Sequence, residues 1–144
     1  MKGALVGTMA AVLLAACAGG GGSAPQISED SKFLSPIAVG DDNPFQFTIT
    51  NGSQAINDLR LCCFGDWLKH NVLTSVDPSA CSRDGDEIKC GALATNVTLV
   101  INLDGVAKDA GNFSYGISVF DGTGDVNQKD GKPAGWTFDQ AVTP

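Results

Sequence analysis

The sequence is poor in positive charge and in histidine, and it lacks a long apolar run. Its 144 residues include 9 lysines and arginines against 16 aspartates and glutamates, with 1 histidine. Nucleic-acid binding draws most of its affinity from basic side chains that neutralise phosphates, so this balance argues against a DNA or RNA partner. The apolar stretch over residues 4–16 is shorter than the roughly 20 residues that a membrane-spanning helix needs. A chain of this length has room for one small domain.

The N-terminal stretch predicts export and lipidation. Lys2 precedes the apolar stretch, as in a secretory signal peptide. The stretch ends in Leu14-Ala15-Ala16-Cys17, which resembles the lipobox of bacterial lipoproteins. The resemblance implies that the chain is cut before Cys17 and that this cysteine carries acyl chains that hold the protein on a membrane. The alternative is an ordinary signal peptide cut near Ala16, with Cys17 left as a free thiol.

We expect three parts: a signal peptide over residues 1–16, the lipidated Cys17 with a glycine-rich flexible tether over 17–31, and a folded domain over 32–144. Loss of Lys2 makes the mature chain one charge more negative than the formal net charge of -7. Ala18, rather than aspartate, resembles the pattern of lipoproteins sent to the outer membrane of a Gram-negative bacterium. In other bacteria the expected location is the outer face of the cytoplasmic membrane.

The remainder predicts an all-β fold. Apolar and polar residues alternate with period two from about Phe33, which is typical of half-buried strands, and no helical period of ten or more residues occurs. Short strands separated by Gly, Asn and Asp turns indicate an Ig-like β-sandwich of seven or eight antiparallel strands. A single helical turn is expected over 66–70. The strand candidates are 45–50, 58–63, 97–104, 113–120 and 136–142, with weaker ones at 34–39, 72–76 and 87–93.

Several segments of this pattern resemble known Ig-like domains. Residues 47–55, the stretch from Cys81 to Cys90 and residues 97–103 look like the bacterial conserved-repeat Ig-like domain, a family of unassigned function found in surface proteins. Residues 109–115 resemble the turn that leads into strand F of immunoglobulin-like domains, with Phe113 at the position of the usual tyrosine. The resemblance implies a surface protein that carries an Ig-like module.

The other four cysteines predict disulfides, because export places them in an oxidising compartment. Cys81 and Cys90 are the easiest pair, since the turn signal Arg83-Asp84-Gly85-Asp86 lies between them and a hairpin would set them opposite one another. Cys62 and Cys63 then form a vicinal disulfide or remain free thiols. Cross-pairing with Cys81 and Cys90 is an alternative, whereas the spacing fits a four-thiolate zinc site poorly.

The loop over residues 121–131 is a weak candidate for a calcium site. Asp121, Asp125, Asn127 and Asp130 place oxygen atoms at odd spacing, as a calcium loop would. The loop departs from the EF-hand pattern, because Val126 stands where glycine is needed and no glutamate closes it. A solvated hairpin loop is therefore the favoured interpretation, and we expect no cofactor.

These features favour a lipid-anchored envelope or surface lipoprotein whose Ig-like module binds without catalysis. Its expected partners are the membrane, through the lipid on Cys17, and a protein, an envelope polymer or a second copy of the chain. The alternative is an acidic periplasmic inhibitor or accessory factor for a basic protein such as a lysozyme. A thiol redox factor using Cys62-Cys63 is the least favoured hypothesis, and no catalytic residue is expected.

Overall fold

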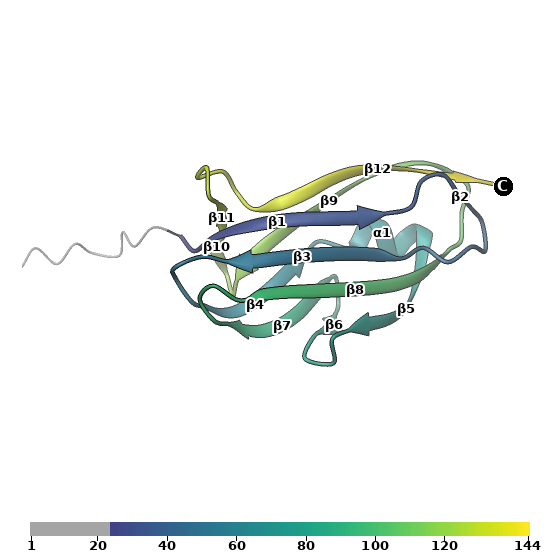
Figure 1. The fold of residues 1–144 in the computed structure, drawn as a ribbon. Coiled ribbons are helices and arrows are strands. Elements are labelled where there is room, and N and C mark those ends of the chain that lie inside the picture. Colours follow the sequence, from purple (N-terminus) through teal and green to yellow (C-terminus); the bar gives the residue numbers. More distant parts are fainter. Residues whose placement is uncertain (1–23) are drawn as a thin grey trace, which may run out of the picture.

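The computed structural model describes residues 24–144, so the expected signal peptide, Cys17 and the first part of the expected tether lie outside the described residues. Two β-sheets pack face to face (Figure 1). One has five strands in the order β11-β1-β3-β8-β5, and the other has seven, in the order β2-β12-β9-β4-β7-β6 with β10 paired to β9. This arrangement confirms the expected all-β, Ig-like sandwich.

Eight of the strands are seven residues or longer, and they pair with one another in antiparallel fashion. Two short pairings at the sheet edges, β1 with β11 and β12 with β2, are parallel. The long strands are β1 (Gln26–Phe33), β3 (Phe45–Asn51), β4 (Ile56–Cys62), β5 (Asn71–Asp77), β7 (Glu87–Leu93), β8 (Thr98–Ala107), β9 (Gly111–Asp121) and β12 (Gly135–Thr143). The remaining elements are β2 (Ile37–Ala38), β6 (Ser82–Asp84), β10 (Gly124–Asp125), β11 (Asn127–Gln128) and the short helix α1 (Gly65–His70).

Apolar side chains from both sheets fill the space between them. Phe47 of β3, Leu59 of β4 and Ile101 of β8 are fully buried there. Helix α1 adds Trp67, whose ring meets the Phe45 ring edge-on at a centroid distance of 5.6 Å. The helical turn predicted over 66–70 thus exists, and it closes one end of the core. Among the described residues, no helix is long and apolar enough to cross a membrane.

The domain begins earlier than the sequence predicts. Residues 26–31, expected in the tether, belong to β1, and Ile27 is fully buried opposite Asn51 of β3. The strand was not recognised because two of its inward positions carry Glu29 and Ser31, which interrupt the apolar alternation. The predicted boundary between tether and domain at residue 31 is therefore wrong.

Three buried amides tie the two sheets together at the end of the sandwich near α1. The side chains of Asn43 and Gln140 bond to each other through both of their amide groups, at 2.8 and 3.0 Å. Asn43 also donates to Asn71 at 2.8 Å, and Gln140 donates to the carbonyl of Leu34 at 2.7 Å. All three amide side chains are buried, so these bonds satisfy groups that water cannot reach. We call Asn43, Asn71 and Gln140 the amide cluster.

Candidate binding pocket

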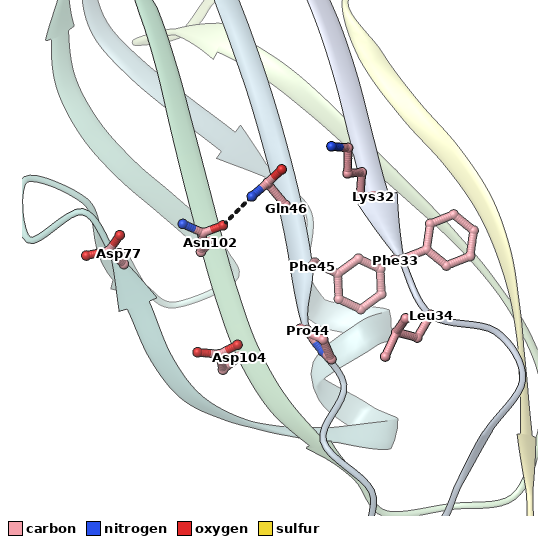
Figure 2. A pocket seen from close by; sticks show the side chains of 9 residues that line it. All are labelled: Lys32, Phe33, Leu34, Pro44, Phe45, Gln46, Asp77, Asn102 and Asp104. Carbon is pink, nitrogen blue, oxygen red and sulfur yellow. Dashed lines mark hydrogen bonds between the residues drawn. The ribbon is translucent and has the colours of Figure 1, made fainter.

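A surface pocket of about 550 Å³ crosses the five-stranded sheet where β1 ends and β3 begins (Figure 2). This volume lies within the roughly 300–1,000 Å³ range of small-ligand sites. Strands β1, β3, β8 and β5, with the segments next to them, all contribute to its lining. The lining residues are Lys32, Phe33, Leu34, Pro44, Phe45, Gln46, Asp77, Asn102 and Asp104.

Strand register creates the polar floor of this pocket. Gln46 of β3 lies opposite Lys32 of β1 on one side and opposite Asn102 of β8 on the other. Because successive strand residues point to opposite faces, these three side chains face outward while Phe45 and Phe47 point into the core. Gln46 donates to Asn102 through their side chains at 2.9 Å, as Figure 2 shows. Within residues 24–144, no other hydrogen bond engages the Gln46 side-chain oxygen or the Asn102 amide group, so both can bind a ligand.

The apolar wall consists of Leu34 and Pro44. Leu34 is 52% exposed, which is unusual for a large apolar side chain that follows a core strand. The amide cluster positions this wall. Gln140 donates a hydrogen bond to the Leu34 carbonyl, and Asn43 directly precedes Pro44 in the chain. The backbone N–H of Asn43 is in turn bonded to the Gly105 carbonyl at 2.7 Å. The wall is therefore held by hydrogen bonds to both sheets.

Opposite charges lie at the two sides of the pocket. Lys32 stands on the β1 side, and the carboxylates of Asp77 and Asp104 stand on the β5 side (Figure 2). Ser75 donates to Asp104 at 2.8 Å. Within residues 24–144, none of the three charged groups takes part in an ion pair. The pocket thus offers two unneutralised carboxylates and one unneutralised ammonium group to a ligand.

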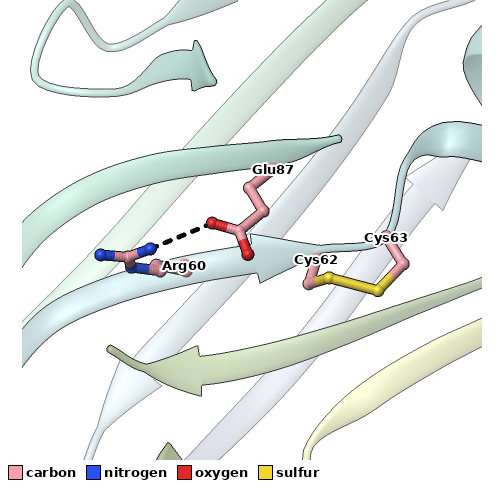
Figure 3. The surroundings of a disulfide bond; sticks show 4 residues. All are labelled: Arg60, Cys62, Cys63 and Glu87. Carbon is pink, nitrogen blue, oxygen red and sulfur yellow. Dashed lines mark hydrogen bonds and ion pairs between the residues drawn. A yellow bond between two sulfur atoms is a disulfide. The ribbon is translucent and has the colours of Figure 1, made fainter. Parts of the chain in front are cut away.

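The vicinal cysteine pair lies at the end of β4 on the other sheet, away from this pocket. The structure joins Cys62 to Cys63 (Figure 3), so the cross-pairing alternative is wrong. Cys63 is exposed and has a φ angle of 114°, a backbone conformation that residues other than glycine rarely adopt. Glu87 of β7 lies opposite Cys62 and forms an ion pair with Arg60 at 3.2 Å (Figure 3).

The second disulfide joins Cys81 to Cys90, as the hairpin spacing predicts. Strands β6 and β7 pair around the turn, with Ser82 opposite Lys89, and this pairing brings the two cysteines together. Both are buried in the main core. With every described cysteine in a disulfide, no thiolate in residues 24–144 is left for zinc.

Two of the four candidate calcium ligands, Asp121 and Asp130, are engaged by other groups of the protein. Asp121 accepts hydrogen bonds from the backbone N–H groups of Asn57 and Asp58 at 3.0 and 2.8 Å, which anchors the start of β4 to the end of β9. Asp130 accepts from the backbone N–H of Lys132 and also pairs with its ammonium group, both at 3.0 Å. The backbone hydrogen bond and the lysine lower the pKa of Asp130.

The other two candidates lie on separate short strands, Asp125 in β10 and Asn127 in β11. The described part of the chain holds no group of three His, Cys, Asp or Glu side chains that could bind a metal ion. Asp121, Asp125, Asn127 and Asp130 therefore do not form a calcium site, and the segment is a hairpin loop between β9 and β12.

The fold and the pocket define an Ig-like β-sandwich with a polar surface site. Two solved structures of one archaeal protein share this architecture. The solution structure of the CARDB domain of PF1109 from Pyrococcus furiosus matches with a TM-score of 0.55 and 13% identity, covering 84% of this chain and 97% of that one. The crystal structure of the same domain, in complex with di-metal ions, matches with a TM-score of 0.52 and 13% identity over 82% of this chain and 88% of that one.

At this level of identity the likeness concerns the fold alone. No protein-family model matches the sequence. No curated protein matches it either. The function is therefore inferred from the residues of this chain.

Proposed function

We propose that the chain is a lipid-anchored protein of the bacterial cell envelope whose Ig-like domain is a non-catalytic binding module. The observation that carries the proposal is the order of features along the chain: Leu14-Ala15-Ala16-Cys17, which resembles a lipobox, then a run of glycines, and then an Ig-like sandwich. Two or three acyl chains on one cysteine hold a protein on a membrane, because each buried methylene adds about 0.8 kcal/mol.

The position of the pocket supports a role in binding a partner beyond the membrane. The domain is attached to the anchor through the start of β1, a strand that runs away from the N-terminal end of the domain (Figure 1). The pocket is lined by residues at the other end of this strand, Lys32 and Phe33. Gln26 and Phe33 are seven residue steps apart in this strand, which corresponds to about 23 Å at about 3.3 Å per residue. The pocket and the anchored end of the domain therefore lie at opposite ends of one strand, which leaves the pocket open to a partner protein or envelope polymer.

The anchor is tested by labelling cells with an alkyne analogue of palmitate. We expect the wild-type protein to incorporate the label and to sediment with membranes, and Cys17→Ser to do neither. The matched control is the double variant Cys62→Ser/Cys63→Ser, which removes two cysteines but leaves the lipobox intact and should label normally. Labelling of Cys17→Ser at the wild-type level would exclude the lipid anchor.

A second candidate function is that of an acidic inhibitor or accessory factor for a basic protein such as a lysozyme. The formal net charge of -7 and the unneutralised pair Asp77 and Asp104 favour it. If this function is correct, the purified protein lowers lysozyme activity at low ionic strength, and added salt reverses the effect because it screens exposed charges. Undiminished lysozyme activity at low ionic strength would argue against it.

A further inference from the structure

We infer that the surface pocket binds a lysine or arginine side chain on an exposed segment of a partner protein. The inference rests on the proposed binding function and specifies the chemistry of the partner. It follows from three properties of the pocket: its apolar wall, its carboxylate pair and its free amide groups.

The apolar wall fits the aliphatic part of a long basic side chain. Lysine and arginine bury their methylene groups along apolar surfaces while the charged end stays in a polar environment. Leu34 and Pro44 present such a surface, and Leu34 is half exposed in the unbound protein. The methylene groups of a bound lysine or arginine side chain would cover this apolar surface.

The carboxylate pair fits the charged end. Asp77 lies opposite Asn102 of β8, and Asp104 lies opposite Ser75 of β5, so the two aspartates are diagonal neighbours on adjacent strands. Such neighbours are about 7–8 Å apart, and like charges at this distance repel each other. A guanidinium or ammonium group between them would replace this repulsion with two favourable interactions.

The remaining polar groups fit a polypeptide backbone. The free carbonyl oxygen of Gln46 accepts a hydrogen bond and the free amide group of Asn102 donates one, which matches the donor and acceptor of a peptide group. Lys32 at the other side of the pocket attracts a carbonyl or carboxylate oxygen of the same segment. A simple cation such as methylammonium would use the carboxylates but not these groups.

The test uses the mature lipidated protein, labelled with ¹⁵N, in detergent micelles. The probe is an acetylated and amidated pentapeptide with a central arginine flanked by alanines, and the control peptide carries neutral citrulline in place of arginine. We expect saturable chemical-shift changes at the side-chain amides of Gln46 and Asn102. Citrulline should weaken binding at least about tenfold, the factor that corresponds to one charge-assisted hydrogen bond.

Matched protein variants complete the test. Asp77→Asn/Asp104→Asn should weaken binding of the arginine peptide at least about tenfold, because it removes both charges but keeps oxygen acceptors. Asp139→Asn, an exposed aspartate of β12 on the other sheet, changes the net charge without touching the pocket and should bind normally. Equal affinity for the two peptides, or shift changes confined to other surfaces, would overturn the inference.

The inference and the proposed function can fail separately. Affinity capture from native envelopes with the wild-type protein tests whether the module has a partner at all. If a partner is captured equally by wild type and by Asp77→Asn/Asp104→Asn, the module binds but the pocket does not recognise a basic side chain. If the wild-type protein captures nothing while palmitate labelling succeeds, the anchor stands and the binding function fails.

Discussion

Glu29 is the residue whose environment most clearly opposes its charge. It points inward from β1, and its Oε2 atom is buried without a hydrogen-bond partner among the described residues. Its Oε1 atom accepts hydrogen bonds from Gln128 at 2.5 Å and from the backbone N–H of Gly135 at 3.1 Å. Burial outweighs these bonds and raises the pKa of Glu29 above its ordinary value of 4.5.

The raised pKa predicts a specific pH dependence of stability. A carboxyl that binds its proton more tightly in the folded state contributes stability below its ordinary pKa, and this contribution is lost as the pH rises through the raised pKa. Glu29→Gln removes the effect, so the stability of the variant relative to wild type should increase from pH 4 to pH 7. Urea unfolding at several pH values measures the free energy of unfolding of the variant and of the wild type. A difference between the two that stays constant from pH 4 to pH 7 would contradict the prediction. Asp30→Asn removes the same charge from an exposed position of the same strand and is the control.

The two disulfides differ in access to solvent, which predicts the order in which they are reduced. Cys63 is exposed, whereas Cys81 and Cys90 are 3% and 8% exposed. Thiol–disulfide exchange requires approach of the attacking thiolate to a sulfur atom. A brief dithiothreitol pulse followed by alkylation and mass spectrometry should label Cys62 and Cys63 first, with Cys81 and Cys90 protected until the domain unfolds. Simultaneous labelling of both pairs would show that the Cys81–Cys90 disulfide is not protected by the fold.

At the scale of elements, the contact between α1 and β8 depends on a glycine. A Cβ atom at Gly105 would lie 2.4 Å from the ring of Trp67 and 3.0 Å from the carbonyl of Val72. Trp67 is buried in the core, so its ring has no free space into which to move. This glycine therefore allows α1 to close the end of the sandwich.

Substitution of Gly105 tests this packing. Gly105→Ala should destabilise the domain by about 1–3 kcal/mol, the usual effect of overpacking a core. Gly116→Ala is the matched control, because a Cβ at this outward position of β9 meets nothing within 4 Å. Chemical denaturation of both variants measures the difference. Equal stabilities would mean that the Trp67 ring adjusts without cost.

The sequence predicted the elements better than it predicted the pocket. Strands such as β3 and β8 show the alternation that places Phe47 and Ile101 in the core, and the turn between Cys81 and Cys90 predicted their pairing. The pocket arises from the register of four strands that are distant in the chain, and no local pattern encodes that register. The amide cluster was missed for a related reason, because Asn and Gln usually mark turns or exposed positions when only neighbours in sequence are considered.

At the scale of the whole molecule, the net charge of the chain and its point of attachment determine how strongly a charged membrane influences the pocket. The chain carries a formal net charge of -7, so an anionic membrane surface repels the domain. The pocket lies about 23 Å along β1 from the start of the domain. This distance exceeds the Debye length of about 10 Å at 0.1 M salt, beyond which exposed charges are largely screened.

This geometry predicts that lipid charge does not alter binding of the basic probe. The experiment places the lipidated protein in vesicles at 0.1 M salt, either neutral or containing anionic lipid. Its affinity for the arginine pentapeptide should agree within about twofold between the two kinds of vesicle. Peptide bound to protein-free vesicles is measured separately and subtracted. The soluble Cys17→Ser protein should give the same value. A pocket held close to the membrane would instead show a peptide affinity that rises with the anionic fraction, because the surface potential concentrates cations within one Debye length. That result would place the pocket against the lipid and would contradict the proposal that it faces a partner beyond the membrane.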